Sequence, residues 1–392
     1  MPIDYPPPKS LSFRVKKVFR YAKIYGVSRT LVKIDSHLHM QRRVAPLAQA
    51  DRPPKADRHV GLLGCGKFAY GVIAYYLTKH FGPVIKGTMD VDAARAASLA
   101  AKYRACYSTT QAEDILADPD IDLVFIASDH ASHADYAVAA LQAGKSVHIE
   151  KPHVVSEKQL VQLCRTMASA PGKVRLGFNR PNSPFGHLIR RHLDDMPGTM
   201  MMSFFVVGHE LEQGHWYLRP DQGGRVLGNL CHWTDFVYQL MPPDKRYPIV
   251  IRPMRTERAD CDIVVSYAFG DGSTAVICFS EKGDTFEGVR ERFSAQKSET
   301  LIAMDDFQRM VIDVADRKLR WNVWHRDQGH EATMVQSYGL SGRGGHQSDG
   351  CAVSYIWETG ELFLKTKAAL ENREEMVVEP FNEQRLNRGD GA

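Results

Sequence analysis

Two histidines spaced two residues apart raise the first question of chemistry in this sequence. His37 and His39 follow apolar residues and Asp35 in the stretch KIDSHLHM. On a β-strand, side chains at i and i+2 point to the same side, so both imidazoles could ligate one metal ion, as on the first strand of many metal-dependent hydrolases. A second pair, His130 and His133, occurs later in the chain. Whether either pair holds a metal depends on what surrounds it.

A glycine-rich turn follows, between an apolar strand and a helix. In HVGLLGCGKFAYGVIAYYL the turn is Gly64-x-Gly66-x-x-Ala69. The first glycine permits a tight turn, the second lets the backbone approach a pyrophosphate, and the small Ala69 lets helix and strand pack closely. The N–H groups at the start of the helix then face the phosphates. This stretch therefore predicts a dinucleotide-binding turn.

An acidic residue ends the next strand, VIKGTMD. Asp90 lies 26 residues after Gly64, where a carboxylate can accept hydrogen bonds from the hydroxyls of the adenosine ribose. Because this carboxylate would repel a 2′-phosphate, Asp90 favours NAD, while the nearby Arg95 leaves NADP possible.

The elements that must position these residues alternate between strand and helix. Short apolar strands are expected at DIDLVFIAS, SVHIE and KVRLGFN, with helices over 92–103, 131–143 and 156–168. The alternation predicts an α/β fold with a parallel, doubly wound sheet of the Rossmann type, whose ligands lie at the carboxyl ends of the strands. Two polar clusters fall at such ends, Ser128-Asp129-His130 with His133, and Glu150-Lys151-Pro152-His153.

The pattern changes after residue 180. MMMSFFVV predicts a strand, SYAFGDGSTAVICF predicts two strands joined by an Asp-Gly turn, further strands are expected over 299–324, and 351–370 predicts a helix. We expect a C-terminal α+β domain with a mostly antiparallel open sheet. The expected divisions are a basic extension and linker at 1–57, a dinucleotide-binding domain at 58–180, and a substrate-binding and oligomerisation domain at 181–392.

These motifs resemble the glucose–fructose oxidoreductase / inositol dehydrogenase (Gfo/Idh/MocA) family over residues 58–390. GCGKFA, DLVFIASDHASHADYAVAALQAGKSVHIEKP, GFNRPNSP and GGRVLGNLCHWTD carry the resemblance, and GKSVHIEKP is the most specific. Members oxidise or reduce hydroxyls, mostly on sugars, nucleotide-sugars and cyclitols, with NAD(H) or NADP(H). The resemblance implies an NAD(P)-dependent dehydrogenase or reductase acting on CH–OH groups, and a homo-oligomer, commonly a dimer or tetramer.

The turn and the resemblance together imply a set of cofactor contacts. The expected residues are Gly64, Cys65, Gly66, Lys67, Phe68, Ala69, Asp90, Ser128, Asp129, His130, His133, Glu150, Lys151 and Arg180. His133 matches a family histidine close to the cofactor, so we expect it to position backbone and nicotinamide rather than a metal. Asp129-His130 stands where the family often has Pro-Asn, so cofactor contacts there can differ.

Oxidation of an alcohol needs a base for the hydroxyl proton and a positive group for the developing alkoxide. Lys151 matches the family lysine, and burial beside a cationic ring could lower its pKa toward neutrality; the plainer alternative is a lysine that only pins the ribose. On GNLCHWTDF, Asn229 and His232 share a helix face, and Asp235 lies three residues further. His232 matches the histidine that contacts the reacting hydroxyl, or is a hydrogen-bonded core histidine.

The same segment departs from the family at one position. Most relatives carry Asp four residues before this histidine, where the chain has Gly228. Asn229 is the nearest polar substitute, and its amide cannot act as a base. Either Lys151 and His232 suffice, or Asp235 helps, or the chemistry differs from simple alcohol oxidation.

The residues before the glycine pair 223–224 are the expected substrate side. Trp216, Tyr217 and Arg219 are the substrate candidates there, preceded by His209 and His215. A tryptophan and a tyrosine at these positions suit core or interface packing equally well.

Two other functions are compatible with these residues. The same fold serves a galactose-pathway transcription repressor that binds dinucleotide without turnover, and Gly228 keeps such a non-catalytic sensor open, although Lys151 and His232 argue against it. The other is an enzyme that reduces an imine or enone, which needs an acid more than an Asp–His relay.

The N-terminal extension carries the positive charge of the chain. The net charge of +4 combines +9 in residues 1–58 with −5 in the remainder. FRVKKVFRYAKIY at 13–25 predicts a basic amphipathic helix with apolar positions Val15, Val18, Phe19 and Ala22. This helix would dock on the body or on another subunit, or contact anionic lipid or a phosphate-bearing substrate, as in surface-polysaccharide assembly. The acidic body without a binding motif argues against nucleic acid.

Composition and termini complete the expectations. The chain has no apolar run of about 20 residues, MPIDYPPPKS has no secretory core, and seven cysteines without a CxxC fit reduced thiols. We therefore expect a cytoplasmic protein. Because the later strands carry dinucleotide signals instead of ligands, we expect no metal at His37 and His39 but a short pairing segment or docked turn. Replacing both histidines by alanine should then leave cofactor binding intact.

Overall fold

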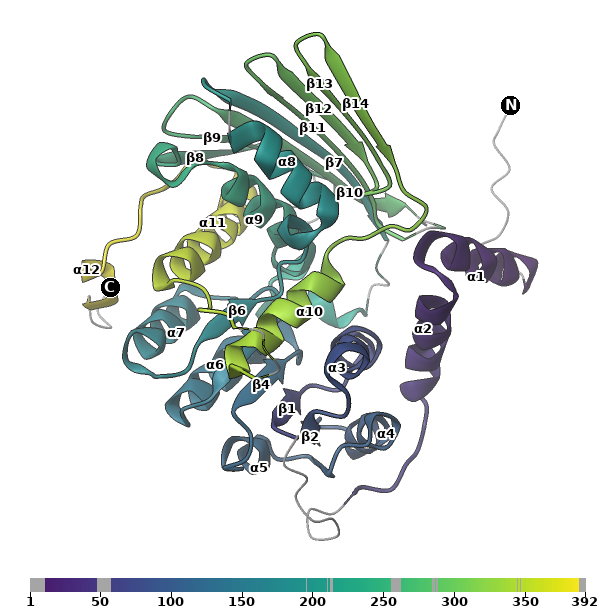
Figure 1. Ribbon diagram of the computed structural model, residues 1–392. Helices are drawn as coiled ribbons and strands as arrows, with labels where there is room; N and C mark the ends of the chain where they lie inside the picture. Colours follow the sequence, from purple (N-terminus) through teal and green to yellow (C-terminus); the bar gives the residue numbers. More distant parts are fainter. Residues whose placement is uncertain are drawn as a thin grey trace.

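Two sheets with packed helices make up most of the molecule, and an N-terminal helix pair lies along one flank (Figure 1). The computed structural model describes residues 11–47, 58–194, 196–209, 211, 214–254, 262–283, 286, 288–343, 345 and 347–387. The predicted combination of a parallel sheet with a mostly antiparallel sheet is confirmed.

The first sheet is parallel, with the strand order β3-β2-β1-β4-β5-β6. Its strands are β1 (Val60–Leu63), β2 (Ile85–Met89), β3 (Tyr107–Thr109), β4 (Leu123–Ile126), β5 (Ser146–Ile149) and β6 (Val174–Leu176). β1, β2 and β4 are buried along their whole length because helices cover both faces of a parallel sheet. The strand order reverses between β1 and β4, which places the binding crevice at their carboxyl ends.

Five helices connect these strands: α3 (Ala74–Phe81), α4 (Ala93–Tyr103), α5 (Ala112–Leu116), α6 (His133–Gln142) and α7 (Glu157–Ser169). A π-helical segment, Ala69–Ile73, runs directly into α3. The carboxylate of Asp92 caps α4 by accepting from the N–H groups of Ala94 and Arg95, and Ser156 caps α7 in the same way. The helices expected over 92–103, 131–143 and 156–168 therefore form.

The second sheet has the order β14-β13-β12-β11-β7-β10-β9-β8-β15. Its strands are β7 (Met200–His209), β8 (Ile249–Pro253), β9 (Ile263–Ala268), β10 (Thr274–Gly283), β11 (Arg290–Lys297), β12 (Thr300–Asp305), β13 (Arg309–Val314), β14 (Arg317–Asn322) and β15 (Met376–Val378). β7 and β10 pair in parallel and the other pairs are antiparallel. Burial alternates along β7 and β11, so one face is packed and the other open.

Helices α8 (Pro184–Asp194), α9 (Cys231–Leu240) and α11 (Val353–Asn372) lie on one side of this sheet (Figure 1). The short α12 (Gln384–Asn387) follows near the C-terminus. α10 (His330–Tyr338) instead returns to the first domain, where Tyr338 stacks on Phe81 at 3.7 Å between ring centroids and its hydroxyl lies 3.0 Å from His59 Nε2. The domain boundaries stay a prediction, and residues beyond 180 contribute to the surroundings of both sheets.

The extension forms α1 (Leu11–Tyr25), as expected, and α2 (Val27–His39). The expectation that KIDSHLHM forms a short pairing segment or a docked turn is wrong, because α2 contains most of it. Residues two apart on a helix are turned about 200° from each other, so His37 is exposed while His39 is buried. The chain then reaches the edge strand β3, where Ser108 N donates to Leu47 O at 3.0 Å. Residues 48–57 of the expected linker lie outside the described residues.

No helix within the described ranges is long and apolar enough to cross a membrane. The described side chains also contain no group of three or more His, Cys, Asp or Glu arranged to hold a metal ion. The absence of a metal at His37 and His39 stays a prediction, but their divergence on α2 removes the geometry that suggested one.

Candidate active site

The glycine turn after β1 has the shape that a dinucleotide requires. Gly64 has φ +90°, and a Cβ there would meet the backbone of Ala127 and Ser128 at 2.5 Å. A Cβ on Gly66 would meet nothing within 4 Å, so this residue borders open space. Lys67 and Phe68 begin the helix, and Ala69 is buried against the sheet. These residues fit a pyrophosphate against the turn and the helix start.

Asp90 holds this turn from the end of β2. Its Oδ2 accepts from Cys65 N at 2.8 Å, and its Oδ1 accepts from Asp92 N at 2.9 Å. Arg95 Nη1 lies 3.8 Å from Asp90 Oδ1 and its Nε lies 3.3 Å from Asp92 Oδ2. The nearby arginine therefore pairs with both Asp90 and Asp92.

The cluster after β4 is a hydrogen-bonded loop around two buried histidines. His133 lies between two carbonyls, with Nδ1 2.8 Å from Pro152 O and Nε2 3.2 Å from Ser128 O. His130 Nδ1 lies 2.9 Å from Gln222 O. Burial lowers the pKa of both imidazoles. His133 thus contacts both the loop after β4 and the loop after β5, and its expected role beside the nicotinamide stays a prediction.

Lys151 follows β5 and points toward α9. Its Nζ donates to Gly228 O at 3.0 Å. Desolvation opposes the ammonium form, but the neighbouring Tyr217, Cys231 and Glu150 favour it, so that the pKa of Lys151 is raised. The expected lowering toward neutrality depended on a bound cationic ring beside the lysine, and for the complex with cofactor it stays a prediction. Lys151 is a positive group at this site and not a free amine base.

His232 and Asn229 face this region from the helical segment that contains Gly228. Residues 226–230 form a π-helical segment that continues into α9. Burial, with Arg180 and Lys151 nearby, lowers the pKa of His232 well below the ordinary value. Its Nδ1 and Asn229 Oδ1 are buried without a hydrogen-bond partner among the described residues. Both atoms are therefore available to a ligand.

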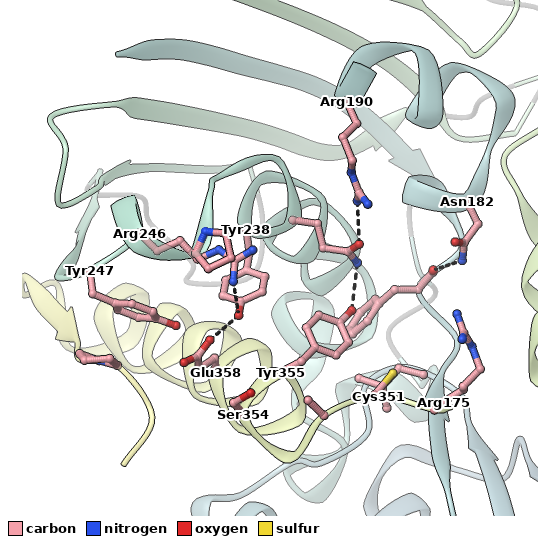
Figure 2. Close-up of a pocket in the computed structure, with 17 residues that line it drawn as sticks. Arg175, Asn182, Arg190, Tyr238, Arg246, Tyr247, Cys351, Ser354, Tyr355 and Glu358 are labelled. Atoms are coloured by element: carbon pink, nitrogen blue, oxygen red, sulfur yellow. Dashed lines mark hydrogen bonds between the residues drawn. The ribbon is translucent and has the colours of Figure 1, made fainter. Parts of the chain in front are cut away.

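Asp235 is not brought to His232. Its Oδ1 accepts from the Tyr355 hydroxyl at 2.6 Å and its Oδ2 from Gln239 Nε2 at 2.8 Å. Burial raises the pKa of Asp235 to about 7. These partners belong to a different region, a cavity of about 580 Å³ lined by Arg190, Tyr355 and other polar residues (Figure 2). None of the expected catalytic or cofactor residues lines that cavity, so we place the active site elsewhere.

A smaller cavity of about 270 Å³ lies next to Gly228, whose carbonyl accepts from Lys151, because Asn229 and Tyr217 line it. Its lining residues are Gly208, His209, Leu211, His215, Trp216, Tyr217, Arg225, Asn229, Phe279 and Val289. Trp216 and Tyr217 thus occupy the expected substrate side. Arg219 does not line it, because its Nη2 lies 3.1 Å from Asp129 Oδ2. We take this cavity as the candidate substrate pocket.

Gly228 explains how this pocket is built. A Cβ on Gly228 would meet the ring of Tyr217 at 2.6 Å and that of His130 at 2.8 Å. The rings of His130 and Tyr217 lie 4.5 Å apart, and Trp216 lies 4.7 Å from His130. The space that a side chain at position 228 would need is therefore filled by aromatic rings.

Two expected cofactor residues have protein partners instead. Arg180 is buried, and its Nε and Nη2 donate to the carboxylate of Glu291 at 2.8 and 3.0 Å. It also lies over the ring of Trp233 at 4.9 Å. Glu150 Oε1 lies 3.0 Å from His148 Nε2. Both residues support the walls of the crevice, and their contact with a cofactor stays a prediction.

Sequence reasoning missed two residues near the site, His330 and Arg225, and the role of a third, His39. His330, at the start of α10, is near Lys151 and Arg180, and burial lowers its pKa to about 3. Arg225 lines the small cavity and pairs with Glu281 at 3.3 Å. His39 contacts the glycine turn from α2. No spacing rule pointed to the first two, because they come from elements far apart in the chain.

Comparison with known proteins supports the assignment of the first domain. Residues 58–178 match the GFO_IDH_MocA family model, described as an oxidoreductase family with an NAD-binding Rossmann fold. The uncharacterized oxidoreductase YrbE of Bacillus subtilis is 26% identical over 199 residues, which cover 49% of this chain and 58% of that protein. The inositol 2-dehydrogenase of Acidothermus cellulolyticus is 30% identical over 179 residues, 40% of this chain and 52% of that protein. The matched residues thus span little more than half the length of each of these two relatives.

Solved structures are similar over most of the chain. Levoglucosan dehydrogenase in complex with NADH has a TM-score of 0.68 at 15% identity, covering 83% of this chain and 100% of that one. GenD2 from gentamicin A biosynthesis, in complex with NAD, has a TM-score of 0.67 at 19% identity, covering 84% and 99%. At these identities the likeness shows the fold. Residues 58–178 are thus similar to the NAD-binding Rossmann domain of the Gfo/Idh/MocA oxidoreductase family.

Proposed function

We propose that the protein is an NAD(H)-dependent oxidoreductase that transfers a hydride between nicotinamide and a sugar-type hydroxyl or ketone. The observation that supports this most directly is the position of Lys151, which joins the end of β5 to Gly228 O at 3.0 Å beside the pocket that Asn229 and Tyr217 line. The relatives and structural neighbours named after inositol and levoglucosan make cyclitols and related sugars the first substrates to test.

The side chains divide the proton chemistry between them. When bound, the nicotinamide supplies or accepts the hydride. The ammonium of Lys151 can stabilise negative charge on the substrate oxygen in both directions, while a single group must take the hydroxyl proton in oxidation and return it in reduction. His232 is neutral, and its unpartnered Nδ1 can accept the hydroxyl proton in oxidation. Asn229 can orient the substrate but cannot take its proton.

Cofactor titration tests the first half of this proposal. We expect purified protein to bind NADH more tightly than NADPH, because Asp90 repels a 2′-phosphate, with nicotinamide fluorescence excited through tryptophan as the measurement. Asp90→Ala should weaken NADH binding. No binding of either dinucleotide by the unaltered chain would remove the oxidoreductase proposal altogether.

Lys151→Ala tests the second half of the proposal, which is turnover of a sugar-type substrate. It also distinguishes an enzyme from a non-catalytic sensor, the alternative that Gly228 leaves possible. For an enzyme, turnover with a substrate found among cyclitols, sugars and nucleotide-sugars should fall about 10²- to 10⁴-fold while NADH binding persists. Unchanged turnover in Lys151→Ala would contradict the assigned role. An enone or imine substrate in the same screen would indicate the third alternative.

We also propose a homo-oligomer and a contact between α1 and an anionic surface or substrate, in a cytoplasmic setting such as polysaccharide assembly. The open face of the second sheet supports the first, since Met201 and Phe205 on β7 are 63% and 53% exposed. The exposed apolar and basic residues of α1 support the second.

A further inference from the structure

His39 is the one member of the HxH pair that contacts the active-site backbone. Its Nε2 lies 2.7 Å from Cys65 O, and its Nδ1 lies 2.9 Å from Ser98 Oγ on α4. A carbonyl can only accept, so Nε2 must donate, and Nδ1 then accepts from the serine hydroxyl. The ring stacks on Tyr70 at 4.2 Å. Burial lowers the pKa of His39, which keeps it in this neutral form.

The hydrogen bond fixes the peptide at the centre of the dinucleotide turn. Cys65 is held on both sides, because its N–H donates to Asp90 Oδ2 at 2.8 Å while its carbonyl accepts from His39. The Cys65–Gly66 peptide is trans. In a planar trans peptide, the C=O and the following N–H point in opposite directions. With its carbonyl turned to His39, this peptide presents the Gly66 N–H on the opposite side.

We propose that His39 is a positioning residue for the cofactor, which sets the Gly66 N–H toward the pyrophosphate by holding the Cys65 carbonyl from behind. The inference rests on the proposed dinucleotide site and adds to it a part of the N-terminal extension. It replaces the expectation from sequence that both histidines could be removed without effect on cofactor binding. His37, exposed on the same helix, has no such role.

The packing of α2 on the cofactor domain keeps His39 in place. Asp35 Oδ2 accepts from the Tyr70 hydroxyl at 2.8 Å and lies 2.9 Å from Lys102 Nζ. Arg42 donates to both Asp35 and Tyr70, with its Nη1 3.1 Å from the Tyr70 hydroxyl. These contacts join α2 to the helix that begins at the turn and to α4. The imidazole is therefore presented at a fixed distance from the glycine turn.

The test compares three variants of the full chain by fluorescence titration with NADH. His39→Leu removes the donor and should raise the Kd about fivefold to tenfold, the range of one lost hydrogen bond. His39→Gln places an amide N–H at a similar reach and should stay within about twofold of the parent. His37→Leu is the matched control on the same helix and should leave the Kd unchanged.

Titrations with ADP and with adenosine distinguish positioning of the Gly66 N–H from a general loss of structure in the variant. ADP carries the pyrophosphate and adenosine does not, so His39→Leu should weaken ADP and leave adenosine unchanged. Equal weakening of both would show a merely structural role and overturn the inference. Parent-like NADH affinity in His39→Leu would overturn it too. If the unaltered chain binds no dinucleotide, the proposed function and this inference fail together.

If His39→Leu does not fold, Ser98→Ala provides the same test more mildly. It removes the partner of His39 Nδ1 and leaves the Cys65 hydrogen bond available to a less fixed ring. We expect a smaller rise in the Kd for NADH and ADP, again without change for adenosine. Circular dichroism and thermal unfolding report whether each variant is folded. A folded Ser98→Ala with parent-like affinity for both nucleotides would then count against the inference.

Discussion

At the scale of single residues, the departure at Gly228 has a physical explanation. Tyr217 and His130 fill the space that a side chain at position 228 would enter. The carbonyl of Gly228 also accepts from Lys151, so one residue joins the aromatic wall to the cationic group. The position of the family carboxylate is therefore not left empty in this chain, because the rings of Tyr217 and His130 occupy that space.

Gly228→Ala should therefore destabilise the fold unless the ring beside it is removed. We expect a loss of about 1–3 kcal/mol in the free energy of unfolding, the range for overpacking a filled site. Tyr217→Ala should offset much of this loss in the double variant, because contacting residues couple. Urea unfolding of the four proteins measures the coupling. Gly214→Ala, where a Cβ meets nothing within 4 Å, is the control.

Strict additivity of Gly228→Ala and Tyr217→Ala would show that the ring does not occupy this space. A loss in Gly214→Ala as large as that in Gly228→Ala would assign the effect to glycine replacement in general.

The residues that sequence could identify are those that serve a local motif. Gly64, Gly66 and Asp90 act through the turn they belong to, so spacing alone was informative. Arg180 was expected at the cofactor because it follows a strand, but Glu291, 111 residues away, accepts its hydrogen bonds. No local pattern encodes such a partner.

At the scale of elements, α9 separates two networks. His232 faces Lys151 on one side, while Asp235 faces Tyr355 and Gln239 on the other. The i, i+3 spacing predicted neighbours on one face, yet the two side chains have different partners. Periodicity predicted the elements well, including the helix over 351–370. Periodicity did not predict the helix at KIDSHLHM, because the side of this helix that is buried against the protein carries the polar residues Ser36 and His39.

Asp235→Asn tests the isolation of this carboxyl. The pKa is raised to about 7 in the folded protein, whereas an unfolded aspartate titrates near about 4. The folded chain therefore holds a proton that the unfolded chain has released, and the stability this provides is lost as pH rises through about 7. The loss builds up between about pH 4 and about pH 7, so the variant, which cannot ionise, should gain more melting temperature over the parent at pH 8.5 than at pH 5.5.

Thermal unfolding at the two pH values measures this difference, and Asp244→Asn, at an exposed position, is the control. A difference between Asp235→Asn and the parent that does not change with pH would show that Asp235 titrates normally.

At the scale of the whole molecule, the extension contacts both the glycine turn and the segment between β14 and α10. α2 contacts the glycine turn through His39. At the junction of α1 and α2, Arg326 N donates to Ile24 O at 2.9 Å, and Arg326 Nη1 donates to the Tyr25 hydroxyl at 3.2 Å. Arg326 also pairs with Asp306 at 3.2 Å. The extension is therefore part of the fold and spans the two domains (Figure 1).

The far side of α1 faces outward with both apolar and basic groups. Val15 and Val18 are 47% and 41% exposed and Phe19 is 73% exposed. The helix contains Arg14, Lys16, Lys17, Arg20 and Lys23 and no acidic residue. An exposed apolar stripe flanked only by cations is the complement of an anionic lipid surface. A second copy of the same helix would bring like charges together, so we expect lipid to be the anionic surface in the contact proposed above.

Sedimentation with vesicles tests this partner. We expect the protein to sediment with vesicles of phosphatidylcholine and phosphatidylglycerol, to stay in solution with phosphatidylcholine alone, and to be released by salt because charges at the surface are screened. Phe19→Asp should abolish sedimentation. Trp324→Asp, at another large exposed side chain, should not, since Trp324 is 77% exposed but lies outside α1. Sedimentation of the Phe19→Asp variant at the parent level would exclude α1 as the contact. A parent that stays in solution but self-associates, with Phe19→Asp monomeric, would instead identify a second copy of the chain as the partner of this face.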